Sequence, residues 1–133
     1  MEINSKGESI FKEYTSGTKE HLTSQVSKIA PDIDAYIKNF VFGEIYARQG
    51  INKQEKVLAT ITALAAMGGC ETELHTHINT AINVKIMPKK IIDTLIQILP
   101  YAGFPRVINA ISICKQVFKE RNVPFDFSEQ NSH

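Results

Sequence analysis

The segment GGCETELHTHI, at residues 68–78, concentrates side chains that can carry out chemistry: one thiol, two carboxylates and two imidazoles. On a helix of about 3.6 residues per turn, Cys70, Glu73 and His77 share one face, whereas His75 lies on another. The segment is compatible with a metal site, a thiol redox site or an acid/base site. The alternative is that it only begins a helix.

A metal site is the poorest of these interpretations. His75 and His77 are two residues apart, so a regular helix cannot direct both imidazoles at one ion. A zinc site would need Cys70, Glu73, His77 and a further ligand from elsewhere, and this spacing does not match known zinc motifs. We therefore predict that the protein binds no metal.

Cys70 is the candidate for thiol chemistry. It stands at or near the start of the predicted helix, where backbone N–H groups favour a thiolate, although Glu71 and Glu73 oppose this. The structural alternative is a small buried cysteine, acidic residues that pair with the helix dipole and a hydrogen-bonded core histidine. The segment alone favours that alternative.

The bulk properties indicate one small protein without an obvious polyanionic partner. A chain of 133 residues, 43% of them apolar, is enough for one domain with a real core. A formal net charge of +1 gives no electrostatic reason to expect nucleic acid or an anionic membrane as a partner. We find neither a signal peptide nor an apolar segment of membrane-spanning length, so we expect a cytoplasmic protein with Cys70 and Cys114 reduced.

Apolar residues recur with helical spacing along almost the whole chain. They predict an all-α, single-domain bundle of about six helices, with helices over 31–47, 53–68, 70–84, 88–99 and 105–121 and one or two more within 6–29. Asn52 and Glu55 have the spacing of a capping box. We divide the chain into an N-terminal helical segment (1–29), a main domain (30–121) and a polar tail (122–133).

Three segments together resemble the carboxymuconolactone decarboxylase family: FGEIYARQGI at 42–51, KVLATITALAAMGGCETELHTHINTAINV at 56–84 and LPYAGFPRVINAISICKQVF at 99–118. The resemblance covers about residues 30–120. It implies an AhpD-like helical fold and a homo-oligomer, a trimer or hexamer, commonly a hexameric ring. The many apolar helices agree with self-association, since they carry more apolar surface than one small core needs.

The resemblance implies one of two chemistries, decarboxylation of 4-carboxymuconolactone or the thiol peroxidase activity of the AhpD branch. Cys70 and His77 match the first cysteine and the histidine of the AhpD motif. Glu73 occupies the position of the second cysteine, which removes the resolving thiol. Cys114 would replace that thiol only if the fold brought it close.

A decarboxylase of this family would bind a small carboxylated lactone and protonate the dienolate left when carbon dioxide departs. For this role we predict His77 as the acid, oriented by Glu73, with Glu44 as a second catalytic candidate. Glu44 would otherwise pair with its i+4 neighbour Arg48, which is itself a candidate for binding a substrate carboxylate. The hydroxyls of Tyr46 and Tyr101 are the remaining substrate-binding candidates, although tyrosines more often only pack.

We therefore predict a homo-oligomeric enzyme with a small-molecule substrate that performs cofactor-independent decarboxylation or related acid/base chemistry. The alternatives are a single-cysteine thiol peroxidase that uses Cys70 and a non-catalytic oligomeric scaffold or binding protein.

Overall fold

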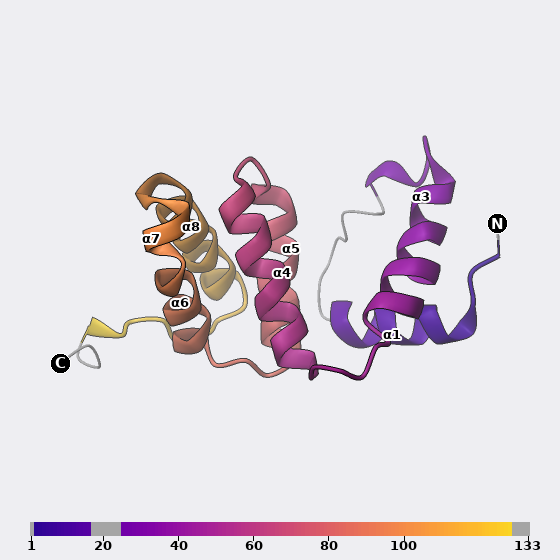
Figure 1. The fold of residues 1–133 in the computed structure, drawn as a ribbon, viewed down its shortest axis with the longest axis horizontal. Coiled ribbons are helices and arrows are strands. Elements are labelled where there is room, and N and C mark those ends of the chain that lie inside the picture. Colours follow the sequence, from indigo (N-terminus) through magenta and orange to yellow (C-terminus); the bar gives the residue numbers. More distant parts are fainter. Residues whose placement is uncertain (1, 17–24, 129–133) are drawn as a thin grey trace.

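The computed structural model describes residues 2–16 and 25–128, and this part of the chain is all-α with no strand (Figure 1). The prediction of an all-α fold is confirmed. The part of the expected N-terminal helix that falls on 17–24, and the tail beyond 128, lie outside the described residues. The elements are α1 (Ser5–Thr15), α3 (Pro31–Tyr36), the π-helix η1 (Ile37–Ile45), α4 (Lys53–Met67), α5 (Glu71–Asn83), α6 (Pro88–Gln97), α7 (Leu99–Ala102) and α8 (Phe104–Glu120).

The helices form two groups (Figure 1). Helices α4 to α8 make a bundle in which α5 packs against α4 and α8, while α6 packs against α4 and α8. The N-terminal group consists of α1, α3 and η1, and α1 lies against both η1 and α5. The N-terminal group therefore lies next to the end of the bundle at which α4 begins and α5 ends.

An aromatic cluster at the ends of α1 and η1 joins the two groups. The ring of Tyr46 stacks on Phe42, with 4.7 Å between centroids, and meets Tyr14 edge-on at 4.8 Å. Tyr14 is only 1% exposed, and its carbonyl accepts a 2.8 Å hydrogen bond from the Asn83 side chain on α5. Aromatic pairs of this kind add stability beyond the apolar area that they bury.

The predicted helix over 31–47 changes its hydrogen-bonding pattern halfway along. From Ile37 to Ile45 it is a π-helix, and the amide of Tyr46 still donates to the carbonyl of Val41, five residues earlier, at 2.8 Å. Spacing rules for α-helices therefore do not apply to side chains on η1.

The capping box predicted at the start of α4 is confirmed. Asn52 Oδ1 accepts from the Glu55 amide at 2.9 Å, and Glu55 Oε1 accepts from the Asn52 amide at 2.8 Å. This reciprocal pair fixes the first residue of α4 because it satisfies two amides that have no partner within the helix.

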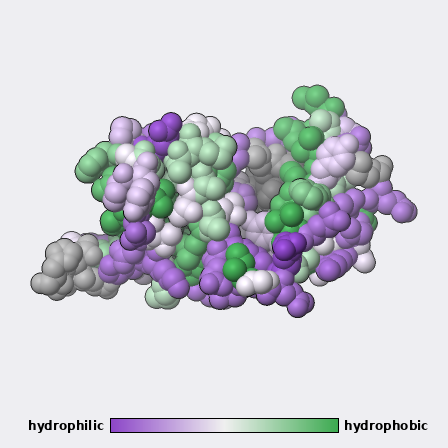
Figure 2. Space-filling model, viewed as in Figure 1, coloured by the Kyte–Doolittle hydropathy of each residue, from purple (hydrophilic) through white to green (hydrophobic). Residues whose placement is uncertain are grey.

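No helix in the described ranges is both long and apolar enough to cross a membrane. Apolar side chains are nevertheless prominent on the surface, including those over α3 and η1 (Figure 2). The exposed large apolar residues include Phe40 on η1, Met67 at the end of α4, and Tyr101, Phe104 and Ile108 on α7 and α8.

Gly7 allows α1 to cross η1 at close range, and we predict that Gly7→Ala destabilises this contact. A Cβ atom built at Gly7 would overlap the carbonyl oxygen of Lys38, which is backbone and cannot easily move away. Overpacking of this kind costs about 1–3 kcal/mol. Urea unfolding of the variant should show a lower midpoint than that of the wild type.

The matched control is Gly50→Ala, because a Cβ at Gly50 would meet nothing within 4 Å. The free energy of unfolding of this variant should be unchanged or slightly raised. Equal midpoints for Gly7→Ala and Gly50→Ala would show that the close approach of α1 and η1 does not limit stability.

Candidate functional site

Helix α5 begins at the cysteine that the sequence singles out. Cys70 is the N-cap of α5 and is half-buried, and its thiol donates to the carbonyl of Gly68 at 3.5 Å. Gly68 and Gly69 both have positive φ angles, 72° and 71°, so the chain reverses between α4 and α5 in a conformation that favours glycine. This reversal makes α4 and α5 antiparallel neighbours.

The acid/base candidates Glu73 and His77 lie on α5, four residues apart and both half-buried, and the Nδ1 atom of His77 is buried. The register between α4 and α5 is fixed where Gln54 donates to the carbonyl of Val84 at 2.9 Å. Thr60 follows Gln54 by six residues, and His77 precedes Val84 by seven. His77 therefore stands at about the same height of the antiparallel pair as Thr60.

A cavity of about 430 Å³ lies between the end of η1, the following loop and α4, and we call it the η1–α4 cavity. It brings together two residues that the sequence predicted for substrate binding, Tyr46 and Arg48. Its lining consists of Ile45, Tyr46, Arg48, Gly50, Ile51, Lys56, Ala59 and Thr60. The described residues of this lining include two cationic side chains and no carboxylate, and the rest are mainly apolar.

The hydrogen bonds in this cavity determine to which group the Tyr46 hydroxyl donates its proton. Thr60 Oγ1 donates to the carbonyl of Lys56 at 2.9 Å, and it lies 3.1 Å from the Tyr46 hydroxyl. A hydroxyl has one proton, so Thr60 has none left for Tyr46 and must accept from it. Burial raises the pKa of Tyr46, which keeps this proton in place. Tyr46 therefore has no free hydroxyl proton for a substrate in this arrangement.

Lys56 holds the C-terminal end of η1. Its ammonium donates to the carbonyl of Tyr46 at 2.7 Å and to the carbonyl of Arg48. Sequence reasoning missed this residue as part of the site. The available signal was a lysine close to the N-terminal, positive end of a helix, where a cation is unfavourable unless another element uses it.

Two further predicted residues lie elsewhere. Glu44 is exposed on η1 and does not line the η1–α4 cavity; within residues 2–16 and 25–128 no salt bridge joins it to Arg48. The i+4 pairing assumed a helix that continues through Arg48, whereas η1 ends at Ile45. Tyr101 is 85% exposed on α7 and lines a different cavity, of about 410 Å³, together with Arg106. The predicted residues thus do not all converge on one cavity.

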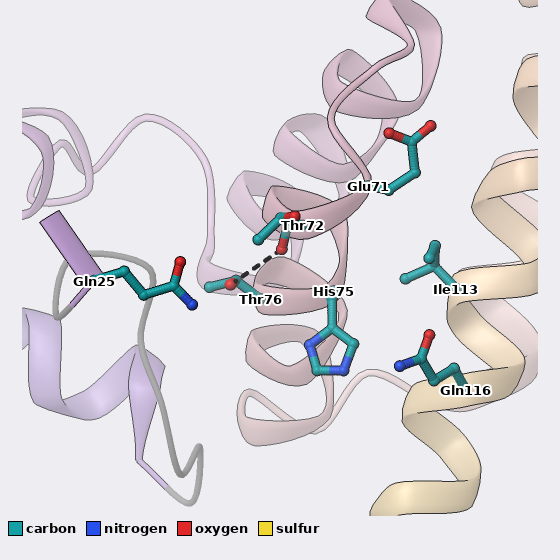
Figure 3. A pocket seen from close by; sticks show the side chains of 7 residues that line it. All are labelled: Gln25, Glu71, Thr72, His75, Thr76, Ile113 and Gln116. Carbon is teal, nitrogen blue, oxygen red and sulfur yellow. Dashed lines mark hydrogen bonds between the residues drawn. The ribbon is translucent and has the colours of Figure 1, made fainter.

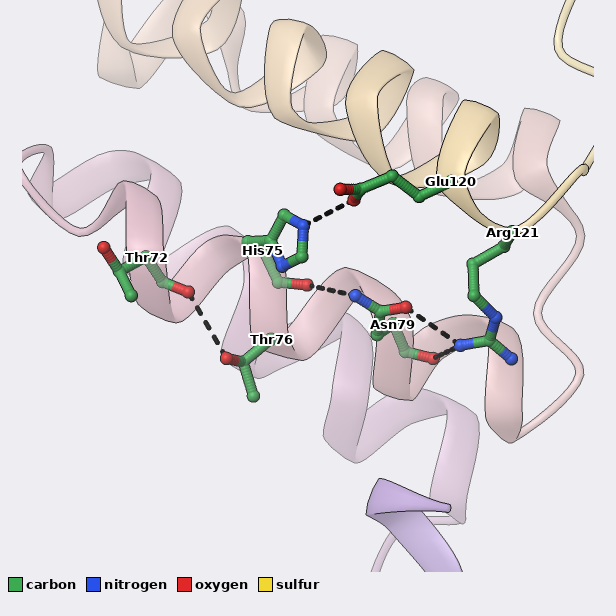
Figure 4. Close-up of polar contacts among 6 residues, drawn as sticks. All are labelled: Thr72, His75, Thr76, Asn79, Glu120 and Arg121. Carbon is green, nitrogen blue, oxygen red and sulfur yellow. Dashed lines mark hydrogen bonds and ion pairs between the residues drawn. The ribbon is translucent and has the colours of Figure 1, made fainter. Parts of the chain in front are cut away.

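His75 faces a third cavity, of about 340 Å³, on the side of α5 next to α8 (Figure 3). Its Nε2 atom lies 2.6 Å from a carboxylate oxygen of Glu120 (Figure 4). One turn further along α5, the Asn79 side chain donates to the carbonyl of His75 and accepts from Arg121. These contacts cross-link α5 to α8. They agree with the prediction that His75 lies on a different face of the helix from His77.

Within the described residues, no three histidine, cysteine, aspartate or glutamate side chains are grouped so that they could hold a metal ion. Both cysteines are free thiols, and Cys114 is completely buried in α8. Burial raises the pKa of the Cys114 thiol to about 12. Cys114 is thus a core residue and is poorly suited to replace the second cysteine of a dithiol site.

Comparison with known proteins gives one family and two relatives. The model of the carboxymuconolactone decarboxylase family matches residues 31–116. A 4-carboxymuconolactone decarboxylase of Acinetobacter baylyi is 28% identical over 92 residues, which are 69% of this chain and 68% of the relative. A Paracoccus denitrificans protein, described as an uncharacterised 15.0 kDa protein in the nqo9–nqo10 intergenic region, is 26% identical over 98 residues, 73% of each chain.

Proposed function

Because the chain belongs to the carboxymuconolactone decarboxylase family, we propose that it catalyses cofactor-independent decarboxylation, or a closely related acid/base reaction, of a small carboxylated lactone. The observation that carries this proposal is the placement on α5 of a half-buried carboxylate and a half-buried histidine four residues apart, Glu73 and His77. His77 stands at about the height of Thr60, which lines a cavity rich in positive charge, and neither His77 nor Glu73 is among the residues that line this cavity. The decarboxylase relative from Acinetobacter baylyi supports the same reaction class.

The chemistry needs an electron sink and a proton. The bond between the ring and the departing carboxylate breaks, carbon dioxide leaves, and the electron pair moves into the conjugated lactone carbonyl. His77 then donates a proton to the resulting dienolate, and the carboxylate of Glu73 orients the imidazole and stabilises its charged form. The lactone thus supplies its own electron sink, and the protein supplies binding, orientation and the proton.

The experiment that tests this function is turnover of 4-carboxymuconolactone by the purified full chain, followed by loss of substrate and release of carbon dioxide. We expect turnover by the wild type and by Cys70→Ser, because the proposed chemistry uses no thiol. The proposal would be overturned if the folded wild-type protein released no carbon dioxide from this lactone or from related carboxylated lactones. Loss of turnover in Cys70→Ser alone would instead indicate thiol chemistry.

Self-association is part of the proposal, as a trimer or hexamer of this chain. The exposed apolar residues around α7 and the start of α8 support it, because Tyr101, Phe104 and Ile108 are each more than half exposed. Apolar side chains that gather on a surface in this way commonly mark an interface.

A charge placed among these residues should disrupt assembly. We predict that Phe104→Glu shifts the protein from oligomer toward monomer in sedimentation velocity, since a carboxylate buried in an apolar interface is strongly unfavourable. The control is Asn109→Glu, at another exposed position of α8. If both variants sediment like the wild type, the face around α7 is not the interface.

A further inference from the structure

We propose that the η1–α4 cavity is a binding site for a small organic anion that combines a carboxylate with an apolar ring. Arg48 and Lys56 hold the carboxylate, and the ring lies against the apolar part of the lining. The identification of this ligand as the substrate rests on the proposed function, and in that reaction the bound carboxylate is the one that the substrate retains. The affinity of the cavity for such an anion does not depend on turnover.

The charges of the cavity are positive and uncompensated. Within the described ranges no acidic residue lines it, and no salt bridge there engages Arg48 or Lys56. The exposed Arg48 guanidinium carries five N–H donors in a fork that matches a carboxylate. The Lys56 ammonium has three donors, of which the carbonyls of Tyr46 and Arg48 use two. One donor and the full charge remain for an anion.

The rest of the lining is suited to the apolar ring of the ligand and offers few hydrogen-bond partners to further polar groups. Ile45 and Ile51 are each about half exposed, at 47% and 50%, and Ala59 and Gly50 add no polar side chain. A bare inorganic anion would leave this surface in water, whereas a ring would cover it. A volume of about 430 Å³ lies within the usual range for small-molecule sites.

Because Tyr46 already donates its hydroxyl proton to Thr60, the cavity recognises a ligand mainly through the positive charges of Arg48 and Lys56. The Tyr46 hydroxyl donates to Thr60, and Thr60 donates to the Lys56 carbonyl, so neither hydroxyl offers a proton to a ligand. The donors left for the ligand belong to Arg48 and Lys56, which are cationic. A neutral molecule of the same shape should therefore bind much more weakly than the anion.

The same charges determine which carboxylate can occupy the cavity. A carboxylate loses its negative charge as it departs as carbon dioxide, so a cation beside it would stabilise the ground state more than the transition state. Arg48 and Lys56 would accordingly slow the reaction if they held the departing group. They favour it when they hold a retained carboxylate and leave the departing one away from both cations.

The test is calorimetric titration of the full chain with sodium benzoate, an aromatic carboxylate, and with benzamide, its uncharged counterpart. We expect benzoate to bind at least tenfold more tightly than benzamide. Arg48→Gln should weaken benzoate binding by about tenfold to a hundredfold, the range of a charge-assisted hydrogen bond. Arg106→Gln, in the cavity beside α7, is the matched control and should leave the affinity unchanged.

Two further variants separate the roles within the site. Tyr46→Phe should leave benzoate affinity unchanged within about twofold, because its proton is used by Thr60. Lys56→Gln, which keeps an N–H donor for the carbonyls and removes the charge, should weaken binding in the same direction as Arg48→Gln. The inference is overturned if benzoate does not bind, if it binds no better than benzamide, or if Arg106→Gln weakens it as much as Arg48→Gln.

Binding and turnover can fail separately. Selective benzoate binding without turnover of any carboxylated lactone would support the anion site and count against the proposed function. Lactone turnover by a protein that does not discriminate benzoate from benzamide would support the proposed function and overturn the anion site.

Discussion

Replacing His77 with glutamine is expected to lower kcat for the carboxylated lactone by about 10²–10⁴-fold, the usual contribution of a positioned general acid. Glutamine keeps a polar side chain on the helix but does not exchange a proton in the required range. KM should change little, because we propose that the cations of the η1–α4 cavity, and not His77, hold the substrate carboxylate. Steady-state assays of substrate loss would measure both constants.

The neighbouring histidine provides the control. His75 lies on the same helix, lines the cavity between α5 and α8 and pairs with Glu120 at 2.6 Å. His75→Gln should therefore retain kcat within a few-fold. If it lost as much activity as His77→Gln, or if His77→Gln kept wild-type kcat, the assignment of the acid to His77 would be wrong.

The two thiols are expected to differ in alkylation rate by about a thousandfold or more in the native protein. Cys114 is fully buried with a pKa raised to about 12. At pH 8 only about 10⁻⁴ of such a thiol is ionised, against about a quarter of an ordinary thiol with a pKa near 8.5. Cys70 is half-buried at the start of α5 and lacks this degree of burial. Peptide mapping by mass spectrometry, during treatment with iodoacetamide, would follow each site.

Unfolding the protein in urea should remove the difference in alkylation rate between Cys70 and Cys114, because both thiols are then exposed. This measurement serves as the internal control. Alkylation of Cys114 in the native state at a rate close to that of Cys70 would contradict its place in the core.

The burial of Cys114 also has a consequence for stability. The unfolded chain releases the Cys114 proton near the ordinary thiol pKa of about 8.5, and the folded chain releases it only at about 12. The free energy of unfolding should therefore fall as the pH rises through this interval.

Much of the fold follows from local signals in the sequence. Apolar periodicity locates the helices, and the Asn52–Glu55 pair defines the start of α4 because both halves of a capping box lie within four residues. The π-helix was not predicted. Its extra residue per turn leaves no distinct pattern in a stretch as apolar as IKNFVFGEI, and packing against α1 takes part in determining the outcome.

The site was predictable only where its residues are close in sequence. Tyr46 and Arg48 were expected to act together, and they line one cavity. The role of Lys56 depends on where the end of η1 meets α4, which is a tertiary contact. Tyr101 and Tyr46 were both predicted as hydroxyl donors, yet Tyr101 is 85% exposed and Tyr46 only 8%. Composition and spacing cannot distinguish them, because neighbouring elements decide which ring is covered.

The π-helix restricts where the length of this chain can change. Removing one residue between Ile37 and Ile45 would turn everything downstream by one helical step relative to α1 wherever the π-helical hydrogen bonds persist. Tyr46 would leave its place against Tyr14 and Thr60, and Arg48 would leave the cavity with it. Substitutions in this stretch are thus expected to be tolerated more readily than single-residue deletions. The loop over residues 48–52, which has no regular hydrogen-bond ladder to keep in register, is the place where relatives of different length should accommodate a gap.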